Sequence, residues 1–233
     1  MKIKKVYLGR KQIYPDWWNP WENTLWYYTF NNTWEDTTGD NADASNISSN
    51  TFVEAYSWSS KKVLNKVSGS YVTLPATVMS TTPSRWTMLF RFKTSNTSNV
   101  RWAEAQTSEY RWTIWLWIDG YWLSMQHWGS YGNRRMAYNT AKNFRDWVWH
   151  LITFSSDNSD VIVWIDTNFS TQYRLNTTSD YSIGAWVYNI GSRASWASNT
   201  STFQMWDFIL ENRSRTEQEK INYYNQTKWN YWL

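Results

Sequence analysis

Cysteine is absent from this 233-residue chain, and histidine is nearly so, with only His127 and His150. The first absence excludes disulfides, thiolate metal sites and a cysteine nucleophile. The second excludes a histidine-rich metal site, and a Ser-His-Asp triad would have to use one of these two side chains. Glycine is also scarce, with 8 residues, and proline is limited to 4. These absences narrow the catalytic and metal chemistry open to the chain.

Long apolar runs and a strong charge of one sign are missing too. No stretch of about eighteen apolar residues is present, so we expect no transmembrane helix and no membrane insertion. The N-terminal stretch MKIKKVYLGRKQIYP has basic residues but no apolar segment long enough for a signal peptide, which predicts a protein made in the cytoplasm. The net charge of +4, from 23 Lys and Arg against 19 Asp and Glu, is too small and dispersed to indicate nucleic-acid binding.

Tryptophan is the residue in excess: the chain has 21, and aromatic residues make up 20% of it. Asn, Ser and Thr are abundant as well, so the mean hydropathy is only -0.69. The combination indicates an aromatic core with polar loops. A chain of this length buries a sizeable core, and a single β-sandwich or barrel domain can account for all of it.

Short segments of alternating apolar and polar residues, separated by polar turns, run through most of the chain. The alternation is clearest between Trp86 and Phe92. Many short strands with such spacing predict an all-β fold, an antiparallel β-sandwich of the jelly-roll type. The expected strands are Leu25–Phe30, Thr51–Trp58, Tyr71–Leu74, Trp86–Phe92, Arg101–Gln106, Arg111–Ile118, Trp122–His127, Val148–Phe154, Val161–Ile165, Tyr181–Ile190 and Phe203–Leu210.

One short helix is expected near the C-terminus. Thr216 and Glu219 have the spacing of a capping box, in which each side chain bonds to the other residue's backbone N–H. Ile221 and Tyr224 would then share one face of the helix. We expect this helix to cover a sheet edge or an end of the sandwich.

The N-terminal residues differ from the rest of the chain. Val6–Tyr14 is predicted to form a short hairpin. Asp16–Glu22, which reads DWWNPWE, is predicted to be a linker or docking segment because prolines bound its paired tryptophans. We therefore divide the chain into an N-terminal hairpin with its linker, residues 1–22, and a sandwich domain, residues 23–233.

Several sequence motifs, in a consistent order, resemble those of the laminin-G-like, concanavalin A-like sandwich domains. Together they cover roughly residues 24–228. The N-terminal V-Y-L-G-x-x-x-I-Y-P is similar to segments that open some bacteriophage and prophage virion proteins ahead of a lectin-like domain. The sandwich motifs lie in Leu25–Ser45, Arg85–Thr94, Arg145–Ser155, Val161–Asp166, Asn189–Arg193 and Phe203–Lys220.

Two glycines of the family pattern are replaced here, one by Trp147 after Asp146 and one by Thr167 after Asp166. Trp147 occupies a tight turn that often needs a positive φ, which a bulky residue resists. One hypothesis is that UGA encodes glycine in the source organism and was read as tryptophan. The other, which we favour, is a divergent lineage that tolerates tryptophan. Sequencing the gene distinguishes them, because UGG codons exclude the first.

The carboxylates do not form the pattern of a sandwich-fold glycosidase. Such enzymes resemble one another in a strand reading E-x-D-x-(x)-E, and retention needs carboxyl groups about 5–5.5 Å apart. Glu104 and Glu109 are five residues apart and Glu35 adjoins Asp36, so neither pair fits on one strand face. His150 would be a general base in one interpretation, but we favour a structural histidine typical of the family. The chain is therefore predicted not to be an enzyme.

An oxygen-rich loop follows the first expected strand of the sandwich. Asp36, Asp40 and Asp43 supply the kind of hard oxygen ligands that calcium prefers, and the resemblance to laminin-G-like domains implies a calcium site at the sandwich rim. An Asx turn whose side chains bond to their own backbone explains the same residues, and we favour it. No cofactor is expected to be required.

An aromatic face is predicted on the neighbouring strands Arg111–Ile118 and Trp122–His127. If these strands pair, alternation brings indole rings and polar side chains together on one side of the sheet. Sugar rings stack on indole through their C–H faces while their hydroxyls bind polar groups. Packing of this face under a loop, a subunit or the C-terminal helix is the alternative. The predicted sugar-binding residues are Trp115, Trp117, Trp122, Trp128, Arg111, Gln126 and Tyr131.

The sequence thus predicts a non-catalytic carbohydrate-binding or adhesion module, placed on a phage particle or a cell-surface assembly. Its expected partner is a glycan or cell-surface polysaccharide, together with other virion or surface-assembly subunits. The alternative is a structural virion or assembly protein whose aromatic faces form subunit contacts without binding sugar. A large assembly in solution would favour the alternative.

Overall fold

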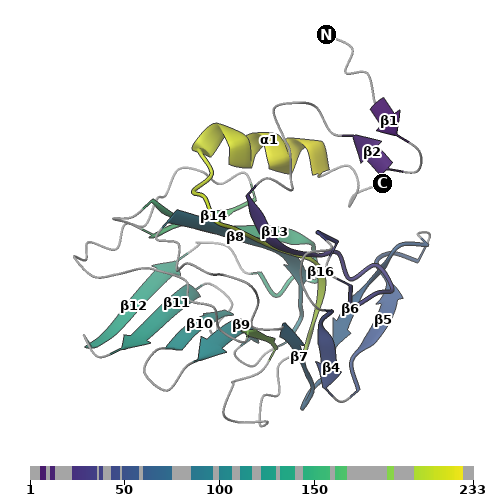
Figure 1. Cartoon of the computed structure of the whole chain (residues 1–233). Helices are drawn as coiled ribbons and strands as arrows, with labels where there is room; N and C mark the ends of the chain where they lie inside the picture. The colour runs from purple at the N-terminus through teal and green to yellow at the C-terminus, as the bar shows by residue number, and fades with distance from the viewer. Residues whose placement is uncertain are drawn as a thin grey trace.

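Two antiparallel sheets of seven strands each pack face to face in the computed structural model of the chain (Figure 1). This is the all-β sandwich that the alternation predicts, and one helix accompanies it. The described residues are 6–8, 11–13, 23–35, 37–38, 43–47, 49–57, 60–74, 85–96, 100–106, 111–116, 122–129, 132–139, 144–157, 161–166, 188–191 and 202–227.

The first sheet is built around its two longest strands, which pair with each other at the centre. The strand order is β14 (Val161–Ile165), β13 (His150–Asp157), β8 (Arg85–Lys93), β16 (Phe203–Glu211), β6 (Lys62–Lys66) and β5 (Thr51–Glu54), with β8 and β16 as the longest strands. A further strand, β3 (Thr24–Tyr28), pairs with the C-terminal half of β16.

The second sheet contains the strands on which the aromatic face is predicted. Every neighbouring pair in it is antiparallel. The strand order is β12 (Gly132–Asn139), β11 (Trp122–Gly129), β10 (Arg111–Leu116), β9 (Val100–Gln106), β15 (Tyr188–Ile190), β7 (Tyr71–Leu74) and β4 (Ser45–Ile47).

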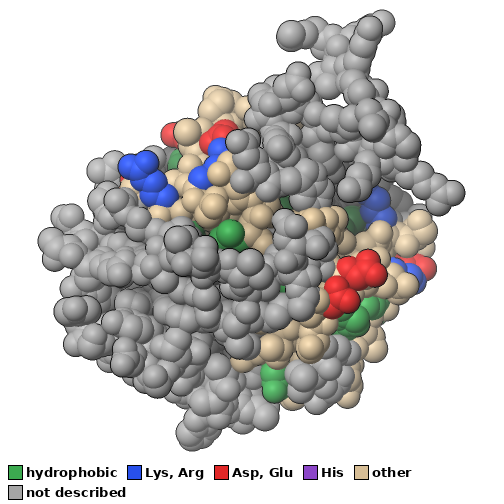
Figure 2. All heavy atoms as spheres, in the orientation of Figure 1, with side chains coloured by type: hydrophobic (Ala, Val, Ile, Leu, Met, Phe, Trp, Pro, Cys, Tyr) green, Lys and Arg blue, Asp and Glu red, His purple; other side chains and the backbone are tan. Residues whose placement is uncertain are grey.

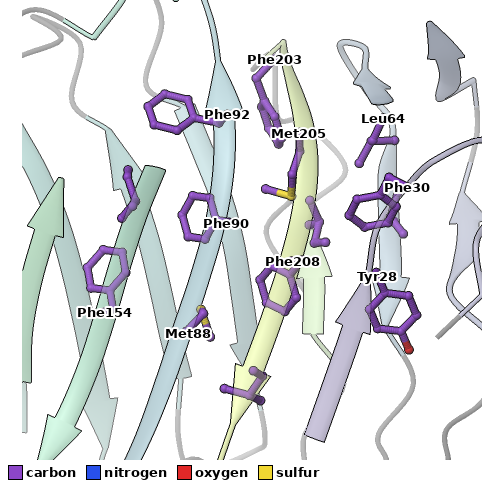
Figure 3. Packing of buried hydrophobic residues seen from close by; sticks show 14 of the residues in the cluster. Tyr28, Phe30, Leu64, Met88, Phe90, Phe92, Phe154, Phe203, Met205 and Phe208 are labelled. Carbon is purple, nitrogen blue, oxygen red and sulfur yellow. The ribbon is translucent and has the colours of Figure 1, made fainter. Parts of the chain in front are cut away.

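The main core lies between the two sheets and is strongly aromatic. In the first sheet, Phe90 of β8 lies between Phe154 of β13 and Phe208 of β16, with ring centroids 6.4 Å and 6.3 Å away (Figure 3). The second sheet contributes Val100 and Ile190, both fully buried. Burial of each such side chain contributes about 1.5–3 kcal/mol to folding. The aromatic excess of the sequence is thus partly explained by this core.

Helix α1 (Glu217–Thr227) begins at the predicted capping box. The Thr216 N–H donates to Glu219 Oε2 at 2.8 Å, and the Glu219 N–H donates to Thr216 Oγ1 at 3.3 Å. The predicted face was wrong by one position, since Lys220 and Tyr223 are the buried residues of the helix. Its 11 residues, in the part of the chain that the structure describes, are too few and too polar to cross a membrane.

Most predicted strands are confirmed, but three were missed. Tyr71–Leu74 and Val161–Ile165 match β7 and β14. The missed strands are β4, β6 and β12, which are short or rich in polar residues. The N-terminal hairpin is also present as β1 (Val6–Leu8) and β2 (Lys11–Ile13), paired antiparallel.

Candidate functional site

The predicted aromatic face falls on β10 and β11, which do pair. The antiparallel register sets Arg111 opposite Trp128, Thr113 opposite Gln126, and Trp115 opposite Ser124. The condition on which the prediction depended is therefore met at the level of the backbone. Trp122 begins β11, whereas Trp117 and Tyr131 lie outside the described residues.

The register also separates core-facing positions of the second sheet from the alternate ones. Ile190, fully buried in the core, pairs with Ala103. Ala103 pairs with Ile114, and Ile114 pairs with Met125. Because directly opposed residues share a face of a sheet, the Ile114 position belongs to the core-facing series. The positions of Arg111, Thr113 and Trp115 belong to the other series.

The predicted calcium loop is only partly described. Asp36 and Asp40 lie outside the described residues, and Asp43 is exposed. The loop's end is fixed by a hydrogen bond from the Ala44 N–H to the Trp34 carbonyl, at 2.8 Å. Among the residues that the structure describes, no group of three or more His, Asp or Glu side chains is arranged to hold a metal ion.

His150 is buried at the start of β13, between two carboxylates. Its Nδ1 lies 2.7 Å from Asp166 Oδ2, and its Nε2 lies 3.0 Å from Asp146 Oδ1. The imidazole also packs edge-on against Phe144, with ring centroids 4.7 Å apart. Both ring nitrogens are thus engaged in joining the segments before and after the β13–β14 hairpin. This environment fits the structural histidine that we favoured over a general base.

The turn that follows Asp146 holds Trp147 in the left-handed region, with φ 59°. The expected positive φ is therefore confirmed. Asp146 Oδ1 accepts a hydrogen bond from the Val148 N–H at 3.0 Å, and the Trp147 N–H donates to the Thr94 carbonyl at 3.2 Å. Trp147 is 48% exposed. Thr167, the second glycine replacement, lies outside the described residues.

An aromatic cluster surrounds Lys93 beside this turn, and we call it the Lys93 cluster. The Lys93 ammonium lies 4.9 Å from the ring centroid of Trp147, 5.1 Å from that of Trp149 and 5.8 Å from that of Tyr56. It also donates to the Ala55 carbonyl at 3.2 Å. The remaining members are Trp206, which packs against Trp149 at 5.7 Å, and Lys61, whose ammonium lies 5.7 Å from the Trp206 ring.

Burial changes the chemistry of several groups in the Lys93 cluster. It lowers the pKa of Lys93, since a desolvated ammonium is penalised. It raises the pKa of Tyr56 to about 12, a shift that the charge of Arg91 partly opposes. The indole Nε1 of Trp149 is buried and finds no hydrogen-bond partner among the described residues. No local sequence pattern predicts this cluster, because its members come from four distant segments.

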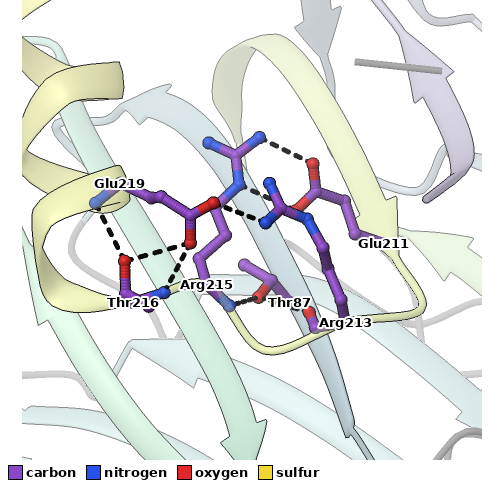
Figure 4. Close-up of polar contacts among 6 residues, drawn as sticks. All are labelled: Thr87, Glu211, Arg213, Arg215, Thr216 and Glu219. Carbon is purple, nitrogen blue, oxygen red and sulfur yellow. Dashed lines mark hydrogen bonds and ion pairs between the residues drawn. The ribbon is translucent and has the colours of Figure 1, made fainter. Parts of the chain in front are cut away.

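The other end of the same sheet face is covered by α1 (Figure 1). Arg91 of β8 forms a buried ion pair with Asp207, at 2.7 Å, and lies over the Tyr223 ring at 5.1 Å. At the helix entry, Arg215 forms a two-pronged contact with Glu211, at 2.7 Å and 2.6 Å (Figure 4). The two buried arginines at this end are therefore each paired with a carboxylate.

Thr87 of β8 joins the segment between β16 and α1 to the sheet. Its hydroxyl donates to the Arg213 carbonyl at 2.8 Å and accepts from the Arg215 N–H at 2.9 Å (Figure 4). Figure 2 shows acidic and basic side chains near one another on one molecular face. Among the described pairs, Lys62 of β6 and Glu54 of β5 form a partly exposed ion pair at 3.4 Å.

Two further lysines are buried, Lys66 of β6 and Lys220 of α1. Burial lowers the pKa of Lys66 and of Lys220 to about 8 in each case. Lys220 of α1 donates to Ser155 Oγ at 2.6 Å. Lys66 runs against Gly191, where a Cβ would come within 2.5 Å of its Cε atom, so this position admits only glycine, which also suits its φ of 84°.

Comparison with known proteins identifies the fold but no family. No family model matches the chain, and no curated protein matches its sequence. Solved structures do match, among them the receptor-binding domain of botulinum neurotoxin D, with a TM-score of 0.69 and 10% identity over 88% of this chain and 53% of that one. A structure of botulinum neurotoxin type C, whose cell entry is described as dependent upon interaction with two ganglioside molecules, has a TM-score of 0.67 and 11% identity over 88% of this chain and 51% of that one.

A third neighbour is the ligand-binding domain of botulinum neurotoxin serotype D in complex with N-acetylneuraminic acid, with a TM-score of 0.68 and 10% identity over 88% of this chain and 51% of that one. The chain spans about half the length of these neighbours. Identity at this level shows the fold alone. The chain therefore has an antiparallel β-sandwich fold, the architecture that it shares with these neighbours.

Proposed function

We propose that the protein is a non-catalytic carbohydrate-binding module whose site lies on β10 and β11. The observation that carries the proposal is the register of these strands. It sets Trp115, Trp122 and Trp128 in the series of backbone positions that alternates with the position of Ile114. By the two-residue period of a strand, these positions lie on the side of the sheet opposite to the series that pairs with the buried Ile190.

The residue types in this series suit a sugar. Arg111 lies opposite Trp128, and Gln126 lies two residues along β11 from it. An indole offers a flat apolar surface for the C–H face of a pyranose, and neighbouring guanidinium and amide groups can bind its hydroxyls. Trp117 and Tyr131 extend the proposed site along the chain beyond the two strands.

The pairing of three carboxylates near α1 supports a binding role over catalysis. Asp207 and Glu211 are each neutralised by a buried arginine, in contacts of 2.7 Å and 2.6 Å. Glu219 caps α1, and its pKa lies below the ordinary value because of hydrogen bonds from Arg213 and Thr216, which outweigh its partial burial. Carboxylates held in this way serve packing and helix attachment, and none is offered to a substrate as a free acid or base.

The wider setting that we propose is a phage particle or a cell-surface assembly, on the resemblance of the N-terminal segment to virion proteins. Domains of this fold were solved with N-acetylneuraminic acid and with rat synaptotagmin II. Each ligand belongs to those toxins. For this chain we propose a glycan partner, which also agrees with the series of tryptophans on β10 and β11.

A glycan array tests the proposal. Purified protein is probed with and without calcium beside the Trp115→Ala/Trp117→Ala variant, and a Lys62→Ala variant on the other sheet is the matched control. We expect glycan binding by the native protein and by the control, and loss in the double variant. Calcium dependence would implicate Asp36, Asp40 and Asp43. No binding to any glycan, with a large species in size-exclusion chromatography, would favour a structural assembly protein instead.

A further inference from the structure

We propose that the Lys93 cluster is a second binding site, on the opposite sheet, for an acidic saccharide. It draws on the proposed function for the class of ligand but not on the β10–β11 site. Four segments build it: the β5–β6 turn with Tyr56 and Lys61, the end of β8 with Lys93, the Trp147–Trp149 turn, and Trp206 of β16. Three properties of this surface point to such a ligand.

The first property is an exposed ring held in a costly conformation. Trp147 and Val148 are the large hydrophobic residues that stand exposed among the described residues, at 48% and 41%. The backbone of Trp147 is left-handed, at φ 59°, which disfavours a bulky side chain. The buried His150, through Asp146, holds the turn in place. Such local strain persists where the surrounding structure enforces it and is concentrated at functional sites.

The second property is positive charge without a matching carboxylate. Lys93 contacts three aromatic rings and the Ala55 carbonyl, and no carboxylate pairs with it among the residues that the structure describes. On the same sheet face, Arg91 has Asp207 as its partner at 2.7 Å. Lys61, which is exposed, adds a second cation at the Trp206 ring. An anionic ligand would supply the carboxylate that Lys93 lacks among the described residues.

The third property is a spare hydrogen-bond donor. Trp149 is 6% exposed, and its Nε1 has no partner in the described part of the chain. A buried donor left without a hydrogen bond destabilises the free protein. It becomes satisfied if a ligand oxygen reaches it. The indole N–H thus points to a ligand that brings acceptor oxygens to the aromatic surface.

An acidic sugar combines the three features that these groups require. Its ring offers C–H groups to the exposed Trp147 indole, its carboxylate pairs with Lys93 and Lys61, and its hydroxyl or carboxylate oxygens accept from Trp149. A neutral sugar would leave the Lys93 ammonium without a carboxylate. An acidic site here and the tryptophan series on β10 and β11 would give the sandwich one binding surface on each sheet.

The test compares oligogalacturonates with their methyl-esterified forms, which keep the ring and remove the charge, on an array that also displays other uronic and sialic acid glycans. The variants are Trp147→Gly, which suits the left-handed backbone, and Lys61→Ala. Lys62→Ala, one residue along the chain, is the control for loss of a positive charge. Circular dichroism and a thermal melt verify that each variant is folded.

We expect native protein and Lys62→Ala to bind acidic glycans more tightly than their esterified forms, and Trp147→Gly and Lys61→Ala each to lose about tenfold or more. Equal binding of acidic and neutral glycans, no acidic glycan bound, or unchanged binding in both variants would overturn the inference. Binding that is lost only in Trp115→Ala/Trp117→Ala would sustain the proposed function while removing this second site.

Discussion

The two ends of one sheet face treat buried charge in opposite ways. Along β8, alternate residues from Leu89 to Lys93 face away from the core. At the Arg91 end, α1 covers the face and Asp207 neutralises the guanidinium. At the Lys93 end, aromatic rings surround the ammonium and Trp147 stands exposed.

At the α1 end, carboxylates of the chain itself pair with the buried arginines, whereas Lys93 at the other end has no carboxylate partner among the described residues. Under α1, each buried cation of β8 and the helix entry has a carboxylate partner, so removal of one partner leaves a buried unpaired charge. In the Lys93 cluster, the ammonium of Lys93 instead contacts aromatic rings and the Ala55 carbonyl. We therefore expect mutations at the first end to affect stability and mutations at the second to affect binding.

The largest stability effect is expected for Asp207→Ala. The change leaves Arg91 charged, buried and without its carboxylate, which should lower the free energy of unfolding by about 3–5 kcal/mol. Urea unfolding measures it. The control is Glu54→Ala, which breaks the partly exposed pair with Lys62 and should cost no more than about 1 kcal/mol. Similar losses in the two variants would contradict the comparison.

The free energy of unfolding should also depend on pH, because α1 buries Lys220. Burial lowers the pKa of Lys220 from its ordinary 10.5 to about 8. Between these values the unfolded chain keeps a proton that the folded chain has lost, so the unfolded state binds more protons and stability rises with pH. The gain is at most about 1.4 kcal/mol per pH unit for one proton. Below pH 8 this slope vanishes.

Urea unfolding from pH 8 to pH 10 measures that rise. Lys66, lowered to about 8 as well, contributes in the same direction. The Lys220→Met variant should show a smaller rise than the native protein, and Lys62→Ala should show an unchanged one. A flat or falling profile in the native protein over this range would refute the assignment of buried, readily deprotonated lysines.

At Trp147 the expected effect is smaller and depends on the replacement. Trp147→Gly should be more stable than Trp147→Ala by about 1 kcal/mol, because alanine is strained at a positive φ and glycine is not. Both variants lose the same ring contact with Lys93, so their difference isolates the backbone. Thermal and urea unfolding of the pair would measure it, and equal stability would contradict a left-handed turn.

The smallest change is expected for Lys93→Met. Removal of the ammonium relieves its desolvation, while the contacts with Trp147 and Trp149 and the bond to the Ala55 carbonyl are lost. These opposed effects should leave the free energy of unfolding within about 1 kcal/mol of the native value. A loss as large as that of Asp207→Ala would mean that the two ends do not differ in kind.

Much of the fold could be predicted from sequence because its signals are local. The alternation from Trp86 to Phe92 predicted the inner face of β8, and the Thr216–Glu219 box predicted the start of α1. The strand β6 was missed because lysines at both ends dilute its apolar centre, although Lys66 is buried. The buried helix face was misjudged because it is formed by the long side chains of Lys220 and Tyr223, whose stems pack while their polar tips bond.

The site is predictable only in part, for a physical reason. The alternation within β10 and β11 is local, so the shared series of Trp115 and Trp128 followed from sequence once pairing was assumed. The Lys93 cluster joins residues from Tyr56 to Trp206, which no periodicity connects. Only the tertiary fold brings them together, although the missing glycine at Trp147 was a local sign that the turn is unusual.

The central claim, a sugar-binding sandwich, is tested most directly by one glycan-array experiment on the native protein, the Trp115→Ala/Trp117→Ala variant and Trp147→Gly side by side. The account predicts that the native protein binds glycans and that the double variant loses the glycans held by β10 and β11 while it keeps the acidic glycans of the Lys93 cluster. It also predicts selective loss of those acidic glycans in Trp147→Gly. An array on which the folded native protein binds no glycan, or on which both variants bind as the native protein does, would contradict it.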